Sequence, residues 1–351
     1  MATTHLGWEN RLAFFWENPL GTVEAIGKTW ISDAADTMSL GAEATRRKVY
    51  GNRYMVNTHL QVLKSSPAGS PGAIAMWFEK LGKQTFLNRI LNSHFQNTYD
   101  ACPLPPLPCF VAHFPVDEQP SELTGFSIAR DIGLGWANSF LWENCVANQL
   151  EISWGVGKPI LCNPTFISLN GQPDEAAPGL VASDTAYQPM LYQAPNIVCT
   201  WGGTHVSVAS FKITSNNGIM VKHDPSSITP VGMSLGNFTA SLEFQTWVDD
   251  DFQTRFVPNY LGTGISPELT GVFEAVVRGP TIEIGGVMKV FYATLHFHGK
   301  IVDVPNAQPK ADGLQTVKVE MTSPGTGDTY EDAGYYIKLD SAYENWQAII
   351  T

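Results

Sequence analysis

The sequence predicts a mainly β protein, built as a sandwich or barrel around long hairpins, with short flanking helices. Two features of the pattern carry this prediction: apolar and polar residues alternate over long stretches, and turn-forming Gly and Asn clusters interrupt them. The third observation is composition, because only 15% of the 351 residues are charged, against about 25% in ordinary soluble domains. So low a charge suggests that other subunits cover much of the surface.

The clearest hairpin is predicted from Asn144 to Leu169. In its first strand apolar residues alternate with polar ones, Leu150, Ile152 and Trp154 against Gln149, Glu151 and Ser153. A Gly-rich turn at 155–158 follows, after which the apolar phase resumes. Two strands bury too little apolar area to offset the entropy of ordering them. The hairpin therefore needs further strands beside it, from its own chain or from a neighbour.

A second hairpin is predicted over residues 206–248. Its first strand, Val206 to Thr214, alternates around a candidate bulge, and an Asn-Asn-Gly turn at 216–218 ends it. The return strand presents polar residues on one face: Thr239, Ser241, Glu243 and Gln245. Further strands are expected within 281–298, joined at Gly285-Gly286, and at 314–321 and 335–339.

Shorter elements precede the first hairpin. Leu6–Trp16 is expected to form either an opening strand or an arm that packs on a neighbour. Strands are expected at Tyr54–Leu63 and Phe110–Phe114, and a Pro-rich loop at Cys102–Cys109. Helical spacing, with a Ser-Pro start, predicts an amphipathic helix through Ile74, Trp77, Phe78 and Leu81. For Phe86–Phe95 the pattern allows either a helix or a strand.

This order indicates two halves, residues 1–172 and 196–351, joined by a Gly- and Pro-rich linker at 173–195. Each half would contain strands and a long hairpin. Two tandem copies of one fold are an alternative, but no residue-level repeat relates the two halves.

Charge and cysteine usage narrow the functional classes. The net charge of -12 argues against tight DNA binding, and the one basic cluster, Arg46-Arg47-Lys48, is interpreted as a solvated loop. Five cysteines without CxxC spacing indicate neither a disulfide framework nor a zinc site, and fit reduced, intracellular assembly. Residues 1–18 lack signal-peptide features, and no apolar run approaches the roughly 18 residues of a membrane span. We expect a soluble chain that no N-terminal signal exports.

Three groups of residues suggest chemistry, and each has a plainer interpretation. Gly232 to Gly236 matches the GxSxG pattern around Ser234, but a strand follows it where a hydrolase would have a helix. His296 and His298 share a strand face without an evident third metal ligand. Asp249-Asp250-Asp251 lacks the glycine and glutamate of a calcium loop. We expect no catalytic residue, metal or cofactor.

Several segments together resemble the major tail tube proteins of long noncontractile-tailed bacteriophages. Trp8 to Leu12 with Asn18 to Thr22 is similar to that family's opening strand and glycine turn, and Gly51-Asn52-Arg53 leads into a strand as it does there. The resemblance continues through the segments before and after the two hairpins, 126–131, 143–150, 209–217 and 269–275. The Pro-rich 102–109 segment departs from the family pattern.

The resemblance implies a tail-tube-type β-sandwich whose hairpins join those of neighbouring subunits into a continuous barrel, with stacked rings enclosing a channel for the genome. The location implied is the virion tail, assembled in the host cytoplasm. The partners implied are other copies of the chain, the tape measure, tail terminator and distal tail proteins, and DNA passing without specific binding. The polar strand faces would line the lumen: Gln149, Glu151, Ser153, Thr239, Ser241, Glu243 and Gln245.

Two details of such an assembly remain open at this level. Trimeric rings with pseudo-sixfold symmetry are favoured, because each half offers a hairpin, and hexameric rings are the alternative. Candidates for inter-subunit contacts are the aromatic and aliphatic residues Trp8, Phe14, Trp16, Ile152 and Trp154. On this interpretation Ile152→Asp would abolish polymerisation and leave subunit expression intact. The rival class is a monomeric β-sandwich hydrolase or carbohydrate-binding protein using Ser234 or the His296/His298 pair.

Overall fold

The computed structural model confirms a mainly β chain. It describes residues 11–17, 20–23, 26–30, 37–40, 42–50, 55–65, 67–75, 77–78, 86–96, 98–99, 109–113, 122–131, 135–182, 190–191, 197–248, 256, 270–284, 287–303, 313–322 and 333–340. The strands are β1 (Arg11–Glu17), β2 (Ile26–Trp30), β3 (Ala42–Tyr50), β4 (Met55–Ser65), β5 (Ala68–Gly69), β6 (Ile74–Ala75), β7 (Trp77–Phe78), β8 (Thr98–Tyr99), β9 (Cys109–His113), β10 (Gly125–Asp131), β11 (Ser139–Gly155), β12 (Leu161–Glu175), β13 (Leu180–Ala182), β14 (Met190–Leu191), β15 (Ile197–Trp201), β16 (Thr204–His205), β17 (Val208–Asn216), β18 (Met220–His223), β19 (Pro230–Ser234), β20 (Thr239–Trp247), β21 (Thr270–Ile284), β22 (Val287–Asp303), β23 (Leu314–Met321) and β24 (Tyr335–Asp340). The helices whose bounds are described are α1 (Phe86–Phe95) and the short 3-10 turn η2 (Trp136–Asn138).

Both predicted hairpins are present, and they lie side by side. β11 pairs with β12, and β17 pairs with β20 past a bulge between Val208 and Ser210, where the sequence predicts one. β11 also pairs antiparallel with β17, from Gln149 opposite Asn216 to Gly155 opposite Ser210. The strand partners that the first hairpin needs therefore come from the second hairpin of the same chain.

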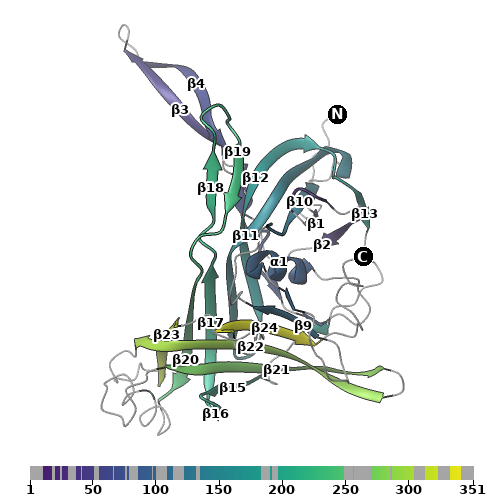
Figure 1. Ribbon diagram of the computed structural model, residues 1–351, viewed down its shortest axis with the longest axis vertical. Coiled ribbons are helices and arrows are strands. Elements are labelled where there is room, and N and C mark those ends of the chain that lie inside the picture. The colour runs from purple at the N-terminus through teal and green to yellow at the C-terminus, as the bar shows by residue number, and fades with distance from the viewer. Residues whose placement is uncertain are drawn as a thin grey trace.

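A second layer crosses this hairpin sheet. β15, β21, β22, β24 and β9 pair in that order, all antiparallel. Figure 1 shows β21 and β22 running across the long strands β17 and β20. The two layers belong to one 18-stranded sheet, because β23 pairs with both β20 and β22.

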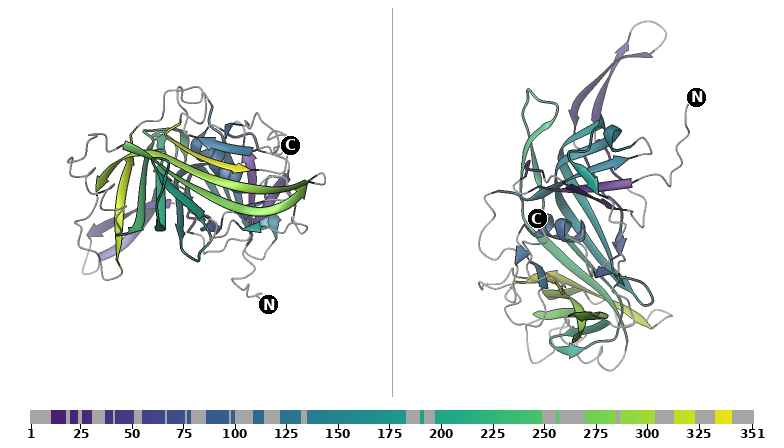
Figure 2. Two further views of the ribbon diagram at one scale, coloured as in Figure 1. Left: turned by 90° about the horizontal axis from the view of Figure 1, so that it is seen from below. Right: turned by 90° about the vertical axis from the view of Figure 1, so that its right-hand side faces the viewer.

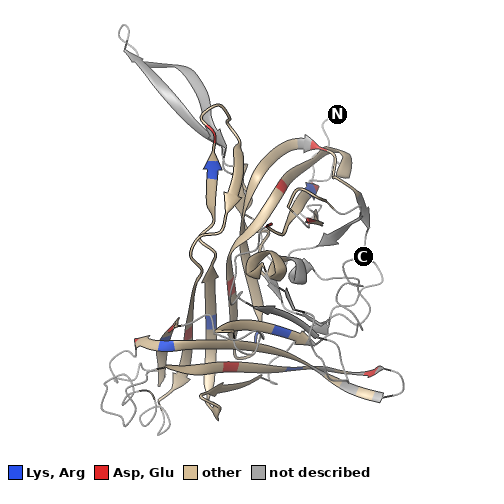
Figure 3. Ribbon diagram, in the orientation of Figure 1, with Lys and Arg blue, Asp and Glu red and all other residues tan. Residues whose placement is uncertain are grey.

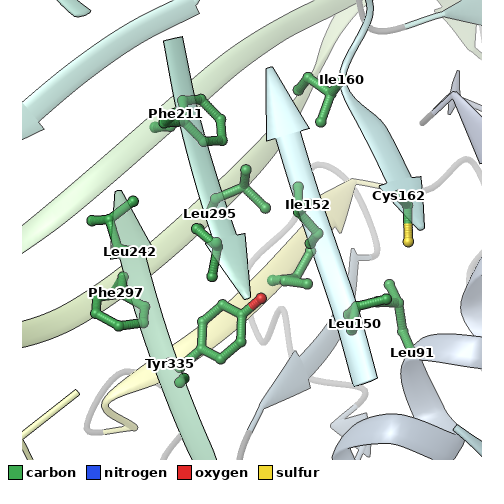
Figure 4. Packing of buried hydrophobic residues seen from close by; sticks show 14 of the residues in the cluster. Leu91, Leu150, Ile152, Ile160, Cys162, Phe211, Leu242, Leu295, Phe297 and Tyr335 are labelled. Carbon is green, nitrogen blue, oxygen red and sulfur yellow. The ribbon is translucent and has the colours of Figure 1, made fainter. Parts of the chain in front are cut away.

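The main core lies between the two layers. Phe244 of β20 stacks on Phe273 of β21 with ring centroids 5.3 Å apart, and Phe211 of β17 lies 5.7 Å from the same ring. Such aromatic contacts add to the free energy gained by burying apolar area. Figure 4 shows the side chains of both layers converging: Leu150, Ile152, Phe211 and Leu242 from the hairpins, and Leu295, Phe297 and Tyr335 from the crossing layer.

The predicted helix at 70–81 is wrong, and the helix lies further along the chain. Ile74–Ala75 forms β6 against β12, and Trp77–Phe78 forms β7 against β14. Pairing with these strands overrides a helical periodicity that spans only two turns. α1 occupies 86–95, the segment left open between helix and strand. Its first turn contains no acidic residue, and its last turn contains one basic residue, His94.

Two loop predictions are also corrected. Arg46-Arg47-Lys48 belongs to β3, a strand paired with β4, and is not a loop. The predicted linker 173–195 contains strand residues, because β12 continues to Glu175, β13 pairs in parallel with β2, and β14 pairs with β7. The division into two halves stays a prediction, although strands from both are interleaved in the large sheet.

Candidate functional site: the polar face of the hairpin sheet

The outward face of five neighbouring strands, β12, β11, β17, β20 and β23, forms one continuous polar surface, which we call the polar wall. Three rows of side chains cross it, as the strand register shows: Thr165, Gln149, Asn216 and Thr239; Asn163, Glu151, Thr214, Ser241 and Glu320; Leu161, Ser153, Lys212, Glu243 and Lys318. A partial fourth row contains Ser210, Gln245 and Thr316. Because side chains alternate between faces, this surface and the apolar core share the same strands.

All seven polar residues singled out from the sequence lie on this wall. Thr239, Ser241 and Glu243 are exposed, and Gln149, Glu151, Ser153 and Gln245 are half-buried. The structure thus brings the two predicted sets onto one face of one sheet.

Sequence reasoning missed the wall residues of β17 and β23. Lys212, Thr214 and Asn216 alternate with buried Phe211, Ile213 and Ser215. β23 follows the same rule, with exposed Lys318 and Glu320 alternating with buried Val317 and Val319. The period-two signal that identified the strands would also have identified these positions.

Charges on the wall are few and nearly balanced. Lys212 Nζ lies 2.7 Å from Glu151 Oε2, and Lys318 Nζ lies 3.5 Å from Glu243 Oε1. With Glu320, the wall strands present three carboxylates and two ammonium groups on this face, a net charge of -1. Figure 3 shows charges of both signs spread thinly over the described strands. The wall is hydrophilic but has no cationic surface that would retain phosphates.

One end of the wall is hollowed. A cavity of about 500 Å³ is lined by wall residues and by three neighbours: Gln149, Thr214, Asn216, Thr239, Ser241 and Glu320, with Phe238, Ala240 and Met321. Its polar groups are amides, hydroxyls and one carboxylate. No nucleophile paired with a base lies among them, so the hollow has no arrangement typical of covalent catalysis.

The predicted inter-subunit residues are buried inside the chain. Phe14 and Ile152 have no exposed area, and Trp16 and Trp154 keep only 5% and 8%. Their interpretation as contacts to a neighbour is wrong, because their side chains are already buried within the chain itself. Trp8 lies outside the described residues.

A serine–histidine pair that the sequence did not reveal holds α1 against the core side of the hairpin sheet. His94 Nε2 lies 2.7 Å from Ser215 Oγ, and Asn217 Nδ2 donates to the carbonyl oxygens of His94, at 2.6 Å, and Ala147, at 2.9 Å. Burial lowers the pKa of His94 to about 3, so the ring is neutral at physiological pH. Both His94 and Ser215 are fully buried, so substrate cannot reach them. The pair is therefore structural.

The other candidates for chemistry lack supporting geometry. Ser234 ends β19, a strand paired with β18, so the strand–turn–helix context of a hydrolase serine is absent around it. His296 stacks on Tyr336 at 4.4 Å between ring centroids, and burial together with nearby His298 lowers its pKa to about 4. Among the described residues, no group of three His, Cys, Asp or Glu side chains is placed to hold a metal ion. Asp249-Asp250-Asp251 lies outside the described part.

Comparisons with known proteins give no family. No family model matches the chain, and no curated protein matches it. The helices within the described residues are too short or too polar to cross a membrane.

Proposed function

We propose that the chain is a structural subunit of a phage tail tube, assembling into stacked rings whose inner barrel forms a channel for the genome. The observation that carries the proposal is the continuous polar wall across both long hairpins, backed by an apolar core. A sheet that is solvent-exposed on one face and buried on the other can close with copies of itself into a hollow barrel. Closure removes the open sheet edges that would otherwise promote aggregation.

The same continuity favours rings of six chains over rings of three. Because both hairpins join in one sheet, each chain offers one barrel segment of four or five strands. With strands about 4.8 Å apart and tilted by about 40°, each strand adds about 2 Å to the barrel diameter. Three chains would give about 24–30 Å between opposite backbones, and six about 48–60 Å. After inward side chains are subtracted, the wider barrel leaves ample room for duplex DNA.

The charge of the wall suits a channel through which DNA passes without binding. Lysines 212 and 318 each lie beside a glutamate, so neither is free to bind a phosphate strongly. The net charge of -1 gives weak repulsion that acts over about 8 Å at physiological salt. By family resemblance, the tape measure, tail terminator and distal tail proteins would be the other partners, in the virion tail.

Negative-stain electron microscopy of the purified full chain tests the proposal. Hollow filaments of stacked rings are expected, and end-on views or native mass spectrometry should give six chains per ring. Rings of three chains would refute the geometric argument for six chains, but they would remain consistent with the proposed tube. Single chains at every concentration, together with a hydrolytic activity that is lost in Ser234→Ala, would refute the tube itself.

A charge change on the wall tests its orientation in such filaments. Glu151→Lys/Glu243→Lys/Glu320→Lys changes the wall from -1 to +5, and we expect tubes that retain DNA inside. The matched control, Glu122→Lys/Asp224→Lys/Glu283→Lys, applies the same change at three exposed carboxylates on no wall strand. If both variants bind DNA only on the outer surface of tubes, the wall does not face the lumen.

No described arrangement favours the rival class, a monomeric hydrolase or carbohydrate-binding protein. Ser234 lies on a paired strand, and His296 is covered by Tyr336.

A further inference from the structure

One hairpin stands apart from the rest of the fold. Among the described strands, β3 and β4 pair with each other in a two-stranded sheet and with no third strand, from Ala42 opposite Ser65 to Tyr50 opposite Met55. Figures 1 and 2 show this hairpin projecting beyond the body of the chain. Nine residues of strand span about 30 Å, so its far end lies well away from the other elements. A two-stranded ribbon is marginally stable alone, which suggests that a partner completes it.

The base of the hairpin fixes where it projects. β5 follows β4 directly and pairs with β12, the edge strand of the polar wall, through Ala68 opposite Ile167. A bridge between Ser39 and Ala68 fixes the chain on the other side of the hairpin. The hairpin therefore leaves the body near β12, at the upper end of the hairpin sheet in Figure 1. A partner that it contacts would be displaced along the direction of the wall strands.

The charge of this hairpin is opposite to that of the remaining chain. Residues 42–65 contain five basic residues and one acidic residue, Arg46, Arg47, Lys48, Arg53 and Lys64 against Glu43, a net charge of +4. Since the whole chain carries -12, the remainder carries -16. Electrostatic screening acts over about 8 Å at physiological salt, whereas strands of this length span about 30 Å. Most of the hairpin therefore lies beyond the electrostatic reach of its own acidic body.

We infer that the β3–β4 hairpin docks on the acidic body of a second copy of this chain. Charge complementarity selects this occupant, because every copy offers a body of -16 to the +4 hairpin of its neighbour. A nucleic acid would also attract the hairpin, but it would be repelled by the acidic body that carries it. The contact joins different surfaces of the two copies, so it repeats head to tail without closing. The inference rests on the proposed tube for the position of the second copy, in the next ring.

The test is a charge reversal in the full-length chain. Arg46→Glu/Arg47→Glu changes the hairpin from +4 to 0. The matched control, Arg278→Glu/Lys300→Glu, makes the same change at exposed residues of β21 and β22. Ring formation and end-to-end growth are followed by sedimentation velocity and electron microscopy from about 0.05 to 0.5 M NaCl, over which the Debye length falls severalfold. Arg46→Ala/Arg47→Ala tests the loss of charge without reversal, and circular dichroism checks folding of every variant.

The expected result is that the hairpin variant forms rings but its end-to-end association weakens at least tenfold, and that the alanine variant is intermediate. Wild type and the Arg278/Lys300 control should stack normally and lose stacking as salt rises. Tubes of the Arg46→Glu/Arg47→Glu variant with wild-type length and salt response would overturn the inference and leave the tube standing. Hairpin-dependent chains of copies without rings would support the inference and refute the tube. Single chains throughout would refute both.

Nucleic acid as the true partner is a distinct outcome. Fluorescence anisotropy with a labelled DNA duplex at about 0.15 M NaCl, where non-specific binding has a Kd of about 10⁻⁴–10⁻⁶ M, should show no hairpin-dependent binding. Binding by wild type that Arg46→Glu/Arg47→Glu abolishes and Arg278→Glu/Lys300→Glu retains would overturn docking on a second copy.

Discussion

Adjacent residues of β11 should respond oppositely to the same substitution. Ile152 is fully buried, and its register partners Cys162 and Ile213 are also fully buried. Ser153, the next residue, lies on the polar wall opposite Lys212, which is 47% exposed. Ile152→Asp should therefore disrupt the fold, whereas Ser153→Asp should be tolerated.

The magnitude follows from burial. Truncating a buried isoleucine costs about 2–5 kcal/mol. An unpaired carboxylate in the same site adds several kcal/mol, and a folded domain has only about 5–15 kcal/mol of stability in total. Ile152→Asp should leave little native protein. The aspartate of Ser153→Asp would lie near an ammonium group in partial contact with water, so its effect should stay within about 0.5 kcal/mol.

Soluble yield and urea unfolding followed by tryptophan fluorescence measure both effects. The structure replaces the expectation that Ile152→Asp only blocks polymerisation, because its side chain points into the chain's own core. An Ile152→Asp protein that unfolds cooperatively within about 1 kcal/mol of wild type would refute this placement. Equal damage from Ser153→Asp would refute the two-faced sheet.

Three further outcomes are expected. Asn217→Ala leaves two buried carbonyl groups without their side-chain donor and should cost about 2–4 kcal/mol in urea unfolding, whereas exposed Asn237→Ala should cost little. Because the folded-state pKa of His94, about 3, lies below its ordinary value of 6.5, its contribution to stability should be full above pH 6.5 and fall by about 2–3 kcal/mol by pH 4.5. His296, whose pKa is lowered to about 4, loses stability over the same range, so His94→Gln should reduce the acid slope without abolishing it and surface His205→Gln should leave it unchanged; a wild-type slope in His94→Gln would contradict the assignment. Burial raises the thiol pKa of Cys162 and Cys199 to about 12, and that of Cys145 is raised as well, so a thiol reagent at pH 8 should label at most two of the five cysteines before unfolding.

The sequence by itself determined the class of fold, most strands and the polar residues of the two hairpins. Alternation with period two identified β11, β17, β20 and β23, because a strand between water and a core imposes that pattern directly on its residues. The same pattern also implied that Ile152 faces a core. Naming Ile152 as an inter-subunit contact was the error, because its side chain is fully buried within the chain.

Only the tertiary structure decided which strands are neighbours. The pairing of β11 with β17 joins residues about 60 positions apart, and hydrogen bonds between backbones leave no residue-specific signal in the sequence. Short segments were decided the same way, because pairing with β12 and β14 overrode the weak helical periodicity at 74–78. That lateral pairing turned two half-polar hairpins into one continuous wall and separated β3–β4 as a basic hairpin on an acidic chain. Both proposals depend on this arrangement.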